Sequence, residues 1–388
     1  MWLNHSVQII TFGRTSVLIN FVILHFLLSM PIFESSAIAH VALHYVGNKG
    51  TGESIILSHK TLPLSEQLQD LLVRYFLSPF KGEEYFTFYH DEDLALNEVY
   101  NRASRIFDDP ETLLEESHQL ARALFNASTH PNIKGGDLFV VYFKECVLEG
   151  KTMDAIGLFK SENKEHFLKV GYTDEQWSTK EDDASATASF TIDIDKGINI
   201  NKLDKGALIF NTEREQGYVV SVVDSTNRGL DAHYWRDDFL QICQREDPYY
   251  KTHSEMTAYK KFVTKELPQQ FEGVSKADQA DLLNRSVEYF KQNNSFDLQR
   301  FSEEVIAQPE VIESFQSFRQ QYQEDNAITL DDSFAIDDSA VKKQSRAFKS
   351  VIKLDKNFHI YVHGNRELIE QGEDERGKYY KVYYSEES

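Results

Sequence analysis

The segment DLFVVYFKECVL (137–148), followed by the turn EGK (149–151) and TMDAIGLFKS (152–161), decides how this chain folds. Two apolar runs rich in β-branched and aromatic residues, joined by a short turn that contains glycine, predict an antiparallel hairpin. The next apolar run, HFLKV (166–170), follows after a short charged segment, and we expect it to continue the same sheet. Four apolar side chains are then predicted to hold this sheet together: Ile156, Leu158, Phe167 and Leu168.

Further strand patterns surround this hairpin. The segment ATASFTIDI (186–194) alternates strictly, with Phe190, Ile192 and Ile194 on one face. Short strands joined by short connections are typical of an antiparallel meander. The remaining strands expected in this half are AIAHVALHYV (37–46), ESIILS (53–58), GALIF (206–210) and GYVVSVVD (217–224).

Helical patterns occur in both halves of the chain. In the first half, Ser65 is predicted to cap one helix, residues 94–107 form a second, and Asp109 with Pro110 begins a third. In the second half helices are predicted over 235–243, 249–266, 275–292, 295–306 and 309–324. Three strands then close the chain: SVIKLD (350–355), NFHIYVHG (357–364) and KYYKVYYS (378–385).

These patterns predict an α+β fold. Its N-terminal half combines an antiparallel β-meander with helices, and its C-terminal half is helical and closed by a small terminal sheet. We expect an α+β domain over 30–230 and a mainly helical domain with terminal strands over 231–388.

Composition narrows the classes of function. The 388 residues carry 41 basic and 62 acidic side chains, which gives a net charge of -21. An acidic chain disfavours non-specific attraction to nucleic acid or anionic lipid, so nucleic-acid binding would require a local basic patch. Cys146 and Cys243 are isolated, and His359 and His363 lack a third ligand, so neither a disulfide, a metal site nor a cofactor is expected.

The segment from 342 to 366 is the clearest local departure from this charge. It carries seven basic residues against one acid, Asp355, for a local charge of +6. A stripe of lysine and arginine can contact successive phosphates of DNA. The alternative is a solvated face neutralised by the acidic loop before it, and composition alone favours that alternative. The basic residues are Lys342, Lys343, Arg346, Lys349, Lys353, Lys356 and Arg366.

The N-terminus allows two interpretations. Residues 15–33 form an apolar run preceded by Arg14, and Ala37-Ile38-Ala39 resembles a cleavage site, as in a secretory signal peptide. The alternative is that translation begins at Met30 and that residues 1–29 are a mis-annotated upstream extension. A membrane anchor is less favoured, because Asn20 and His25 interrupt the run.

Several spaced blocks carry a resemblance to a known family. The blocks 58–86, IGLFKSENKEHFLKV (156–170), LDKGALIF (203–210), AHYWRDDFLQ (232–241) and FKSVIKLDKNFHIYVHG (348–364) resemble the NdpA-like nucleoid-associated proteins, in the form seen in Bacteroidetes-type bacteria. The resemblance runs from about residue 33 onward, which implies Met30 as the initiator. It implies a non-catalytic, cytoplasmic protein on the nucleoid and no membrane partner.

The resemblance leaves the route to the chromosome open. The protein could bind double-stranded DNA directly and without sequence preference, using the basic residues of 342–366 together with exposed Lys160, Lys164 and Lys169. It could instead be a protein-interaction module that a DNA-bound partner recruits. A third hypothesis, a nucleic-acid-processing enzyme that uses Asp237 and Asp238, has little support, because these acids suit the first turn of a helix.

Overall fold

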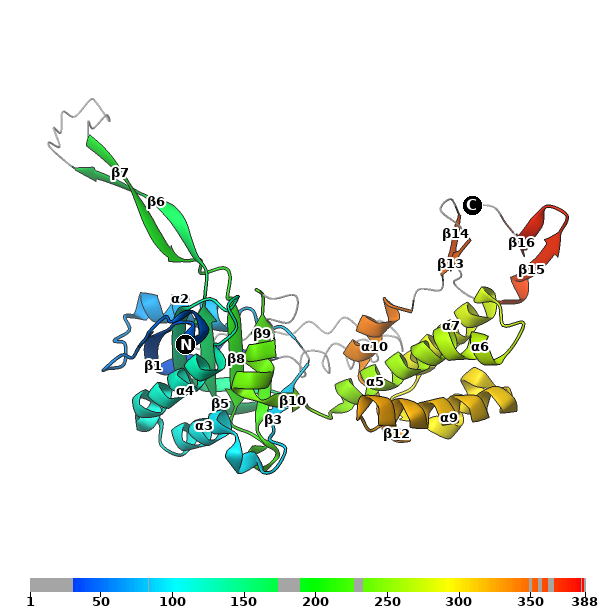
Figure 1. The fold of residues 1–388 in the computed structure, drawn as a ribbon, viewed down its shortest axis with the longest axis horizontal. Helices are drawn as coiled ribbons and strands as arrows, with labels where there is room; N and C mark the ends of the chain where they lie inside the picture. The colour runs from blue at the N-terminus through cyan, green and yellow to red at the C-terminus, as the bar shows by residue number, and fades with distance from the viewer. Residues whose placement is uncertain are drawn as a thin grey trace, which may run out of the picture. The chain divides into compact units, whose positions relative to one another are not determined.

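The computed structural model describes residues 31–82, 84–173, 189–226, 233–348, 351–354, 358–361, 366–384 and 386. The chain forms two compact units, Met1–Arg245 and Glu246–Ser388, whereas the sequence analysis places the division after residue 230. Each unit is described by itself below. The mixed α+β fold class is confirmed (Figure 1).

The body of the first unit is an eight-stranded antiparallel sheet with the order β10-β3-β9-β8-β5-β4-β1-β2. The predicted hairpin of β4 and β5 lies at its centre, with Val140 opposite Leu158 and Val147 opposite Thr152. The meander continues from β5 to β8 and β9. The strands are β1 (Ala37–Val46), β2 (Ile55–Ile56), β3 (Phe86–Phe88), β4 (Gly136–Leu148), β5 (Lys151–Ser161), β8 (Lys205–Phe210), β9 (Val219–Asp224) and β10 (Ile242–Gln244).

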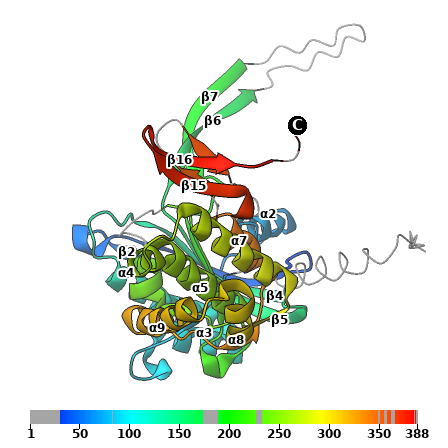
Figure 2. The same cartoon turned by 90° about the vertical axis from the view of Figure 1, so that its right-hand side faces the viewer.

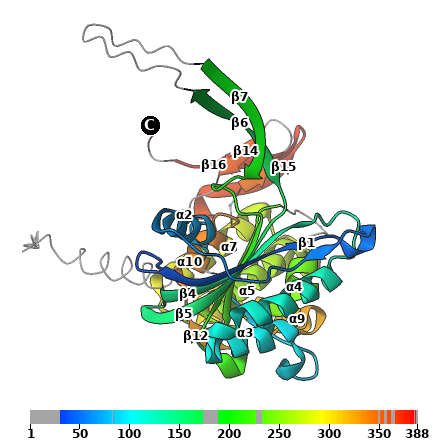
Figure 3. The same ribbon diagram turned by 90° about the vertical axis from the view of Figure 1, so that its left-hand side faces the viewer.

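Both faces of this sheet are covered, which explains why β4 is apolar throughout. Leu138, Val140 and Tyr142 point to a core shared with α3 (Glu98–Asp108), α4 (Leu113–Ala127) and the π-helix η6 (Tyr234–Leu240). The alternate residues Phe139, Val141 and Phe143 point to a second core under α2 (Glu66–Leu77). Figure 3 shows α2 on one side of β1, β4 and β5, with α3 and α4 on the other.

The helix starts of this unit follow from their caps. The Ser65 hydroxyl accepts from the N–H of Leu68 at the start of α2, as predicted. The helix predicted over 94–107 begins later, because Asn97 caps α3 after the short turn η2 (Leu94–Leu96). Asp109 caps the turn η3 (Pro110–Thr112), which leads into α4. The other short helices of this unit are η1 (Lys49–Thr51) and η4 (Arg214–Gln216).

One prediction about the sheet is wrong. Residues 166–170 do not continue it, because β6 (Lys164–Thr173) pairs with β7 (Ser189–Ile198), and β5 pairs with β8 instead. Strands β6 and β7 form a separate two-stranded hairpin that extends beyond the body of the unit (Figure 1). We call this hairpin the β6–β7 arm. Phe167 is 49% and Leu168 66% exposed, so these side chains do not hold the sheet together, whereas Ile156 and Leu158 are buried.

The second unit is a helical bundle with an aromatic core (Figure 2). The rings of Tyr259, Phe262, Phe301 and Phe315 pack against one another there. The capping box of Ser275 and Asp278 begins α7 at the predicted place. The helices are α5 (Pro248–Lys261), η7 (Phe262–Glu266), α6 (Leu267–Gln270), α7 (Lys276–Gln292), α8 (Leu298–Phe301), η8 (Ser302–Ile306), α9 (Pro309–Asn326), α10 (Asp338–Ser345) and η9 (Arg366–Leu368).

Short strand pairs complete this unit. Strands β11 (Ser295–Asp297) and β12 (Ser333–Ala335) pair within the bundle. The chain end is made of two hairpins, β13 (Val351–Lys353) with β14 (His359–Tyr361), and β15 (Ile369–Asp374) with β16 (Gly377–Val382). The sequence patterns predict three of these four terminal strands but not β15. Cys146 is buried and Cys243 is exposed.

Candidate nucleic-acid interface

Helix α10 carries the first part of the basic run. The Asp337 carboxylate begins the helix, since it accepts hydrogen bonds from the N–H groups of Ser339 and Ala340 at 3.0 and 2.8 Å. Ala340 and Val341 are buried. Burial of this side leaves the opposite side of the short helix in solvent.

The exposed side of α10 ends in three cations. Lys342, Lys343 and Arg346 are exposed, and the spacing of four residues places Lys342 and Arg346 on one helix face. We call these three residues the α10 basic end. Lys343 is engaged within the unit: its Nζ donates to the Tyr249 hydroxyl at 2.7 Å and lies 5.4 Å from the centre of that ring.

The predicted basic stripe does not continue along this helix. Helix α10 ends at Ser345, with Arg346 as its C-cap, and Phe348 is buried soon after. Lys353 lies on β13 and Arg366 begins η9, so both belong to other elements. Lys349 and Lys356 lie outside the described residues. Of the predicted basic run, the described part of α10 therefore carries only Lys342, Lys343 and Arg346.

Helix α5 brings one further cation close to Phe348. Lys260 Nζ lies 5.8 Å from the centre of the Phe348 ring, which follows the α10 basic end by two residues. The sequence analysis does not single out Lys260. It occupies the last turn of a helix that the sequence does predict, but only the packing of α10 against α5 reveals its neighbours.

The acids of this region lie at the other end of α10. Asp337 and Asp338 occupy its N-terminus. Asp331 pairs with Lys251 at 2.6 Å, and Asp332 pairs with Arg319 at 2.7 Å. The helix is thus acidic at its start and basic at its end, which is the distribution that its dipole favours. A phosphate would meet the cations, although the same dipole slightly opposes an anion at that end.

Lys160 is not part of an exposed surface, and its prediction as a phosphate contact is wrong. Its side chain is fully buried, and its ammonium donates to the Lys134 carbonyl at 2.7 Å and to Glu162 Oε1 at 3.1 Å. The Tyr234 hydroxyl lies 3.1 Å away and itself donates to Glu162 at 2.6 Å. Burial lowers the pKa of Lys160, and the carboxylate of Glu162 opposes that shift. The cluster is structural.

The other two lysines of this region differ from each other. Lys164 Nζ pairs with Asp137 at 2.8 Å, which ties the start of β6 to β4. Lys169 is exposed on β6, opposite Asp193 of β7. Each lysine therefore lies beside a carboxylate. Lys164 forms an ion pair with Asp137, and Lys169 is the register partner of Asp193 across the strand pair.

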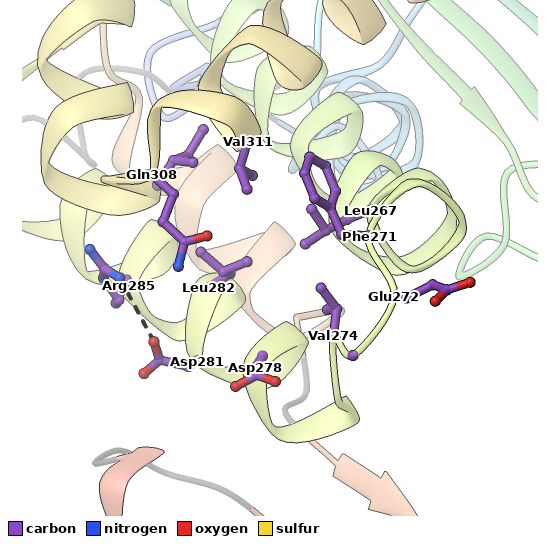
Figure 4. Close-up of a pocket in the computed structure, with 12 residues that line it drawn as sticks. Leu267, Phe271, Glu272, Val274, Asp278, Asp281, Leu282, Arg285, Gln308 and Val311 are labelled. Atoms are coloured by element: carbon purple, nitrogen blue, oxygen red, sulfur yellow. Dashed lines mark ion pairs between the residues drawn. The ribbon is translucent and has the colours of Figure 1, made fainter.

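The second unit also contains a pocket of about 470 Å³ between α6, α7 and the start of α9. Leu267, Phe271, Val274, Leu282 and Val311 give it an apolar floor (Figure 4). Its polar rim is mainly acidic, with Glu272, Asp278 and Asp281.

The one cation in this lining is Arg285, which is paired with Asp281 at 3.8 Å and donates to the Glu304 carbonyl at 2.7 Å. Such a rim repels phosphate. The pocket fits an apolar ligand that carries positive charge.

Comparison with known proteins identifies the family. The family model described as nucleoid-associated protein YejK matches residues 42–377. The chain belongs to this family. The resemblance to NdpA-like proteins is thereby confirmed over most of the chain, while the Bacteroidetes-type lineage stays a prediction. No curated protein matches the chain significantly.

No group of three or more histidine, cysteine, aspartate or glutamate side chains in the described part of the chain is placed to hold a metal ion. In the first turn of η6, Asp237 Oδ2 lies within hydrogen-bonding distance of His233 Nδ1, at 2.5 Å. Within the ranges that the structure describes, no helix has both the length and the apolar character needed to cross a bilayer.

Proposed function

We propose that this YejK-family protein binds double-stranded DNA directly and without sequence preference, and that the α10 basic end supplies its first phosphate contacts. The observation that carries this proposal is the exposure of Lys342 and Arg346 on one face of α10, in a chain of net charge -21. Lys349, Lys353 and Lys356 continue the same run of sequence, and we propose them as further contacts. Such a protein acts in the cytoplasm, on the nucleoid.

The net negative charge does not prevent this binding. At physiological salt, charges separated by more than about 8 Å are largely screened, so the cations nearest to a phosphate dominate its energy. Each neutralised phosphate also releases counterions, which makes binding weaken as salt rises. Contacts to phosphate alone carry no sequence information, which predicts similar affinity for unrelated duplexes.

The test is a double charge reversal, Lys342→Glu with Arg346→Glu. We expect the affinity for a duplex at low salt to fall by about tenfold or more, and the salt slope to decrease by about 2, because two phosphate contacts are lost. Fluorescence anisotropy with two unrelated duplexes measures both quantities. Lys343 is left unchanged, because its bond to Tyr249 would confound the result with unit stability.

The matched control reverses two exposed lysines of the first unit, Lys81→Glu with Lys151→Glu. It changes the net charge by the same amount, and we expect it to weaken binding far less. Equal losses in the two double variants would show that only net charge matters. Unchanged affinity in the α10 variant would contradict the proposed interface.

A second candidate function is recruitment by a DNA-bound protein. The acidic rim and apolar floor of the pocket in the second unit favour it, because they suit a basic, amphipathic segment of such a partner. This function predicts that the purified chain does not bind DNA, yet is retained on DNA coated with nucleoid proteins. Glu272→Lys would then reduce retention, whereas Glu324→Lys, at the far end of α9, would not.

A further inference from the structure

The β6–β7 arm has one apolar face that the described part of the chain leaves in solvent. In register, Leu168 lies opposite Ile194 and Val170 opposite Ile192, and directly paired residues share a face. These four side chains are 66%, 74%, 62% and 66% exposed, respectively. Phe190, two residues before Ile192 on β7, extends this apolar face along the arm. We call Leu168, Val170, Ile192 and Ile194 the apolar face of the arm.

The other face of the arm is mostly polar. Lys169 lies opposite Asp193, and Thr191 lies opposite Gly171. The two faces therefore differ as the two faces of a strand pair do when one is packed and the other solvated. A two-stranded hairpin is only marginally stable by itself in water, and contiguous exposed apolar surface usually marks an interaction site.

DNA is a poor occupant for this face. The two strands carry three lysines, Lys164, Lys169 and Lys196, against three carboxylates, Glu165, Asp193 and Asp195. Their net charge is zero with neutral histidine. Neutral strands joined by an acidic segment, residues 174–188, offer no electrostatic attraction to a phosphate backbone, on which affinity for DNA mainly depends.

We propose that the apolar face of the arm packs against the same face of a second copy of this chain, and that the β6–β7 arm is the dimerisation element. This inference does not depend on the proposed function. A two-fold axis places the two hairpins face to face as two small sheets, about 10 Å apart, with identical side chains interdigitated. The β-branched and leucine side chains form a narrow, regular strip that suits such self-association.

Area and charge both favour a second copy as the occupant. Two such faces together, with the flanking Phe190, bury on the order of 1,000 Å², which is the lower limit for a specific interface. Two chains that each carry a net charge of -21 repel each other. The paired strands of the arm carry no net charge, so this repulsion is weaker along them than over the whole chain, and a pairing that keeps the acidic connecting segments 174–188 apart is favoured.

Sedimentation velocity of the full chain over a concentration series tests the proposal. We expect a reversible monomer–dimer equilibrium that raised salt strengthens, because salt screens the repulsion between the two acidic bodies. DNA binding has the opposite salt dependence, so failure of one proposal is distinguishable from failure of the other. Ile192→Lys should weaken the dimer by at least tenfold, and so should the milder Leu168→Ser.

Thr191→Lys is the matched control, because it adds the same charge to the adjacent position on the polar face. We expect it to dimerise like the unaltered chain. A chain that begins at Met30 must also dimerise, which separates the arm from the apolar run of residues 15–33. A monomer at all concentrations would overturn the proposal, and so would a dimer that Ile192→Lys leaves unchanged or that the chain from Met30 has lost.

Discussion

At the scale of single residues, Lys160 is buried although its charged sequence context predicts an exposed side chain. Lys160 begins the sequence KSENK, which is typical of an exposed turn. In the structure it is still part of β5, between Leu138 of β4 and Lys205 of β8. A position inside a sheet is set by pairing with strands that are distant in sequence. The local pattern therefore could not show that Lys160 is buried, or that Glu162 and Tyr234 surround it.

The Lys160 cluster gives a prediction about stability. Lys160→Met removes the cation and leaves the nearly buried Glu162 carboxylate without it, so we expect a loss of about 3 kcal/mol in the free energy of unfolding of the first unit. Urea unfolding followed by tryptophan fluorescence measures this loss, because all three tryptophans, Trp2, Trp177 and Trp235, precede residue 246.

Lys164→Met is the comparison for that experiment. Lys164 also pairs with a carboxylate, but its side chain is 40% exposed. Its loss should therefore change the stability by less than about 1 kcal/mol. Similar effects of the two substitutions would contradict the structural role assigned to Lys160.

At the scale of elements, patterns with a local cause were predictable. The hairpin of 137–161 and the cap at Ser65 follow from turn and capping chemistry, and both are confirmed. The partner of residues 166–170 was not predictable, because alternation identifies an apolar face without showing what covers it. The 295–306 segment shows the same limit: it begins as β11, which needs β12, a strand more than thirty residues later.

The candidate interface was predictable in the same partial way. Charge counting locates Lys342, Lys343 and Arg346, and the structure confirms that they are exposed. Charge counting could not locate the end of α10. The helix ends at Ser345 because the chain then turns to place Phe348 in a core assembled from distant segments. For the same reason, Lys260 could not be placed close to Phe348 from sequence.

Strand β1 and helix α4 are joined by a buried histidine whose titration should be visible. His44 Nδ1 accepts from the Ser58 N–H at 3.1 Å, and Nε2 then donates to the Ser117 hydroxyl at 2.9 Å. Burial, and secondarily His118, lowers the pKa of His44 from 6.5 to about 4. The unfolded chain binds this proton more readily than the folded chain, so stability falls as pH decreases from 6.5 toward 4.

Between about pH 7 and pH 5 this histidine should cost about 2 kcal/mol of stability. Urea unfolding of the unaltered chain and of His44→Gln over that range measures its share. We expect the difference between the two free energies of unfolding to narrow as the pH falls. A difference that stays constant would show that His44 titrates alike in the folded and unfolded chain.

At the scale of the whole molecule, the chain combines a strongly acidic composition with membership of a nucleoid-associated family. The two proposals reconcile the acidic composition with DNA association, because they assign DNA binding and self-association to two separate local sites. The α10 basic end is a local site for phosphate, and the β6–β7 arm is a neutral site for a second copy. A dimer carries two α10 basic ends, and binding of one raises the effective concentration of the other wherever both can reach the same duplex.

The most direct measurement is a fluorescence anisotropy titration of a labelled duplex with the full chain, at low and at physiological salt. Direct binding by the α10 basic end predicts saturable binding at low salt, a steep loss of affinity as salt rises, and equal affinity for unrelated sequences. Absence of binding at both salt concentrations would contradict direct binding. The acidic pocket and a DNA-bound partner would then become the route to the chromosome.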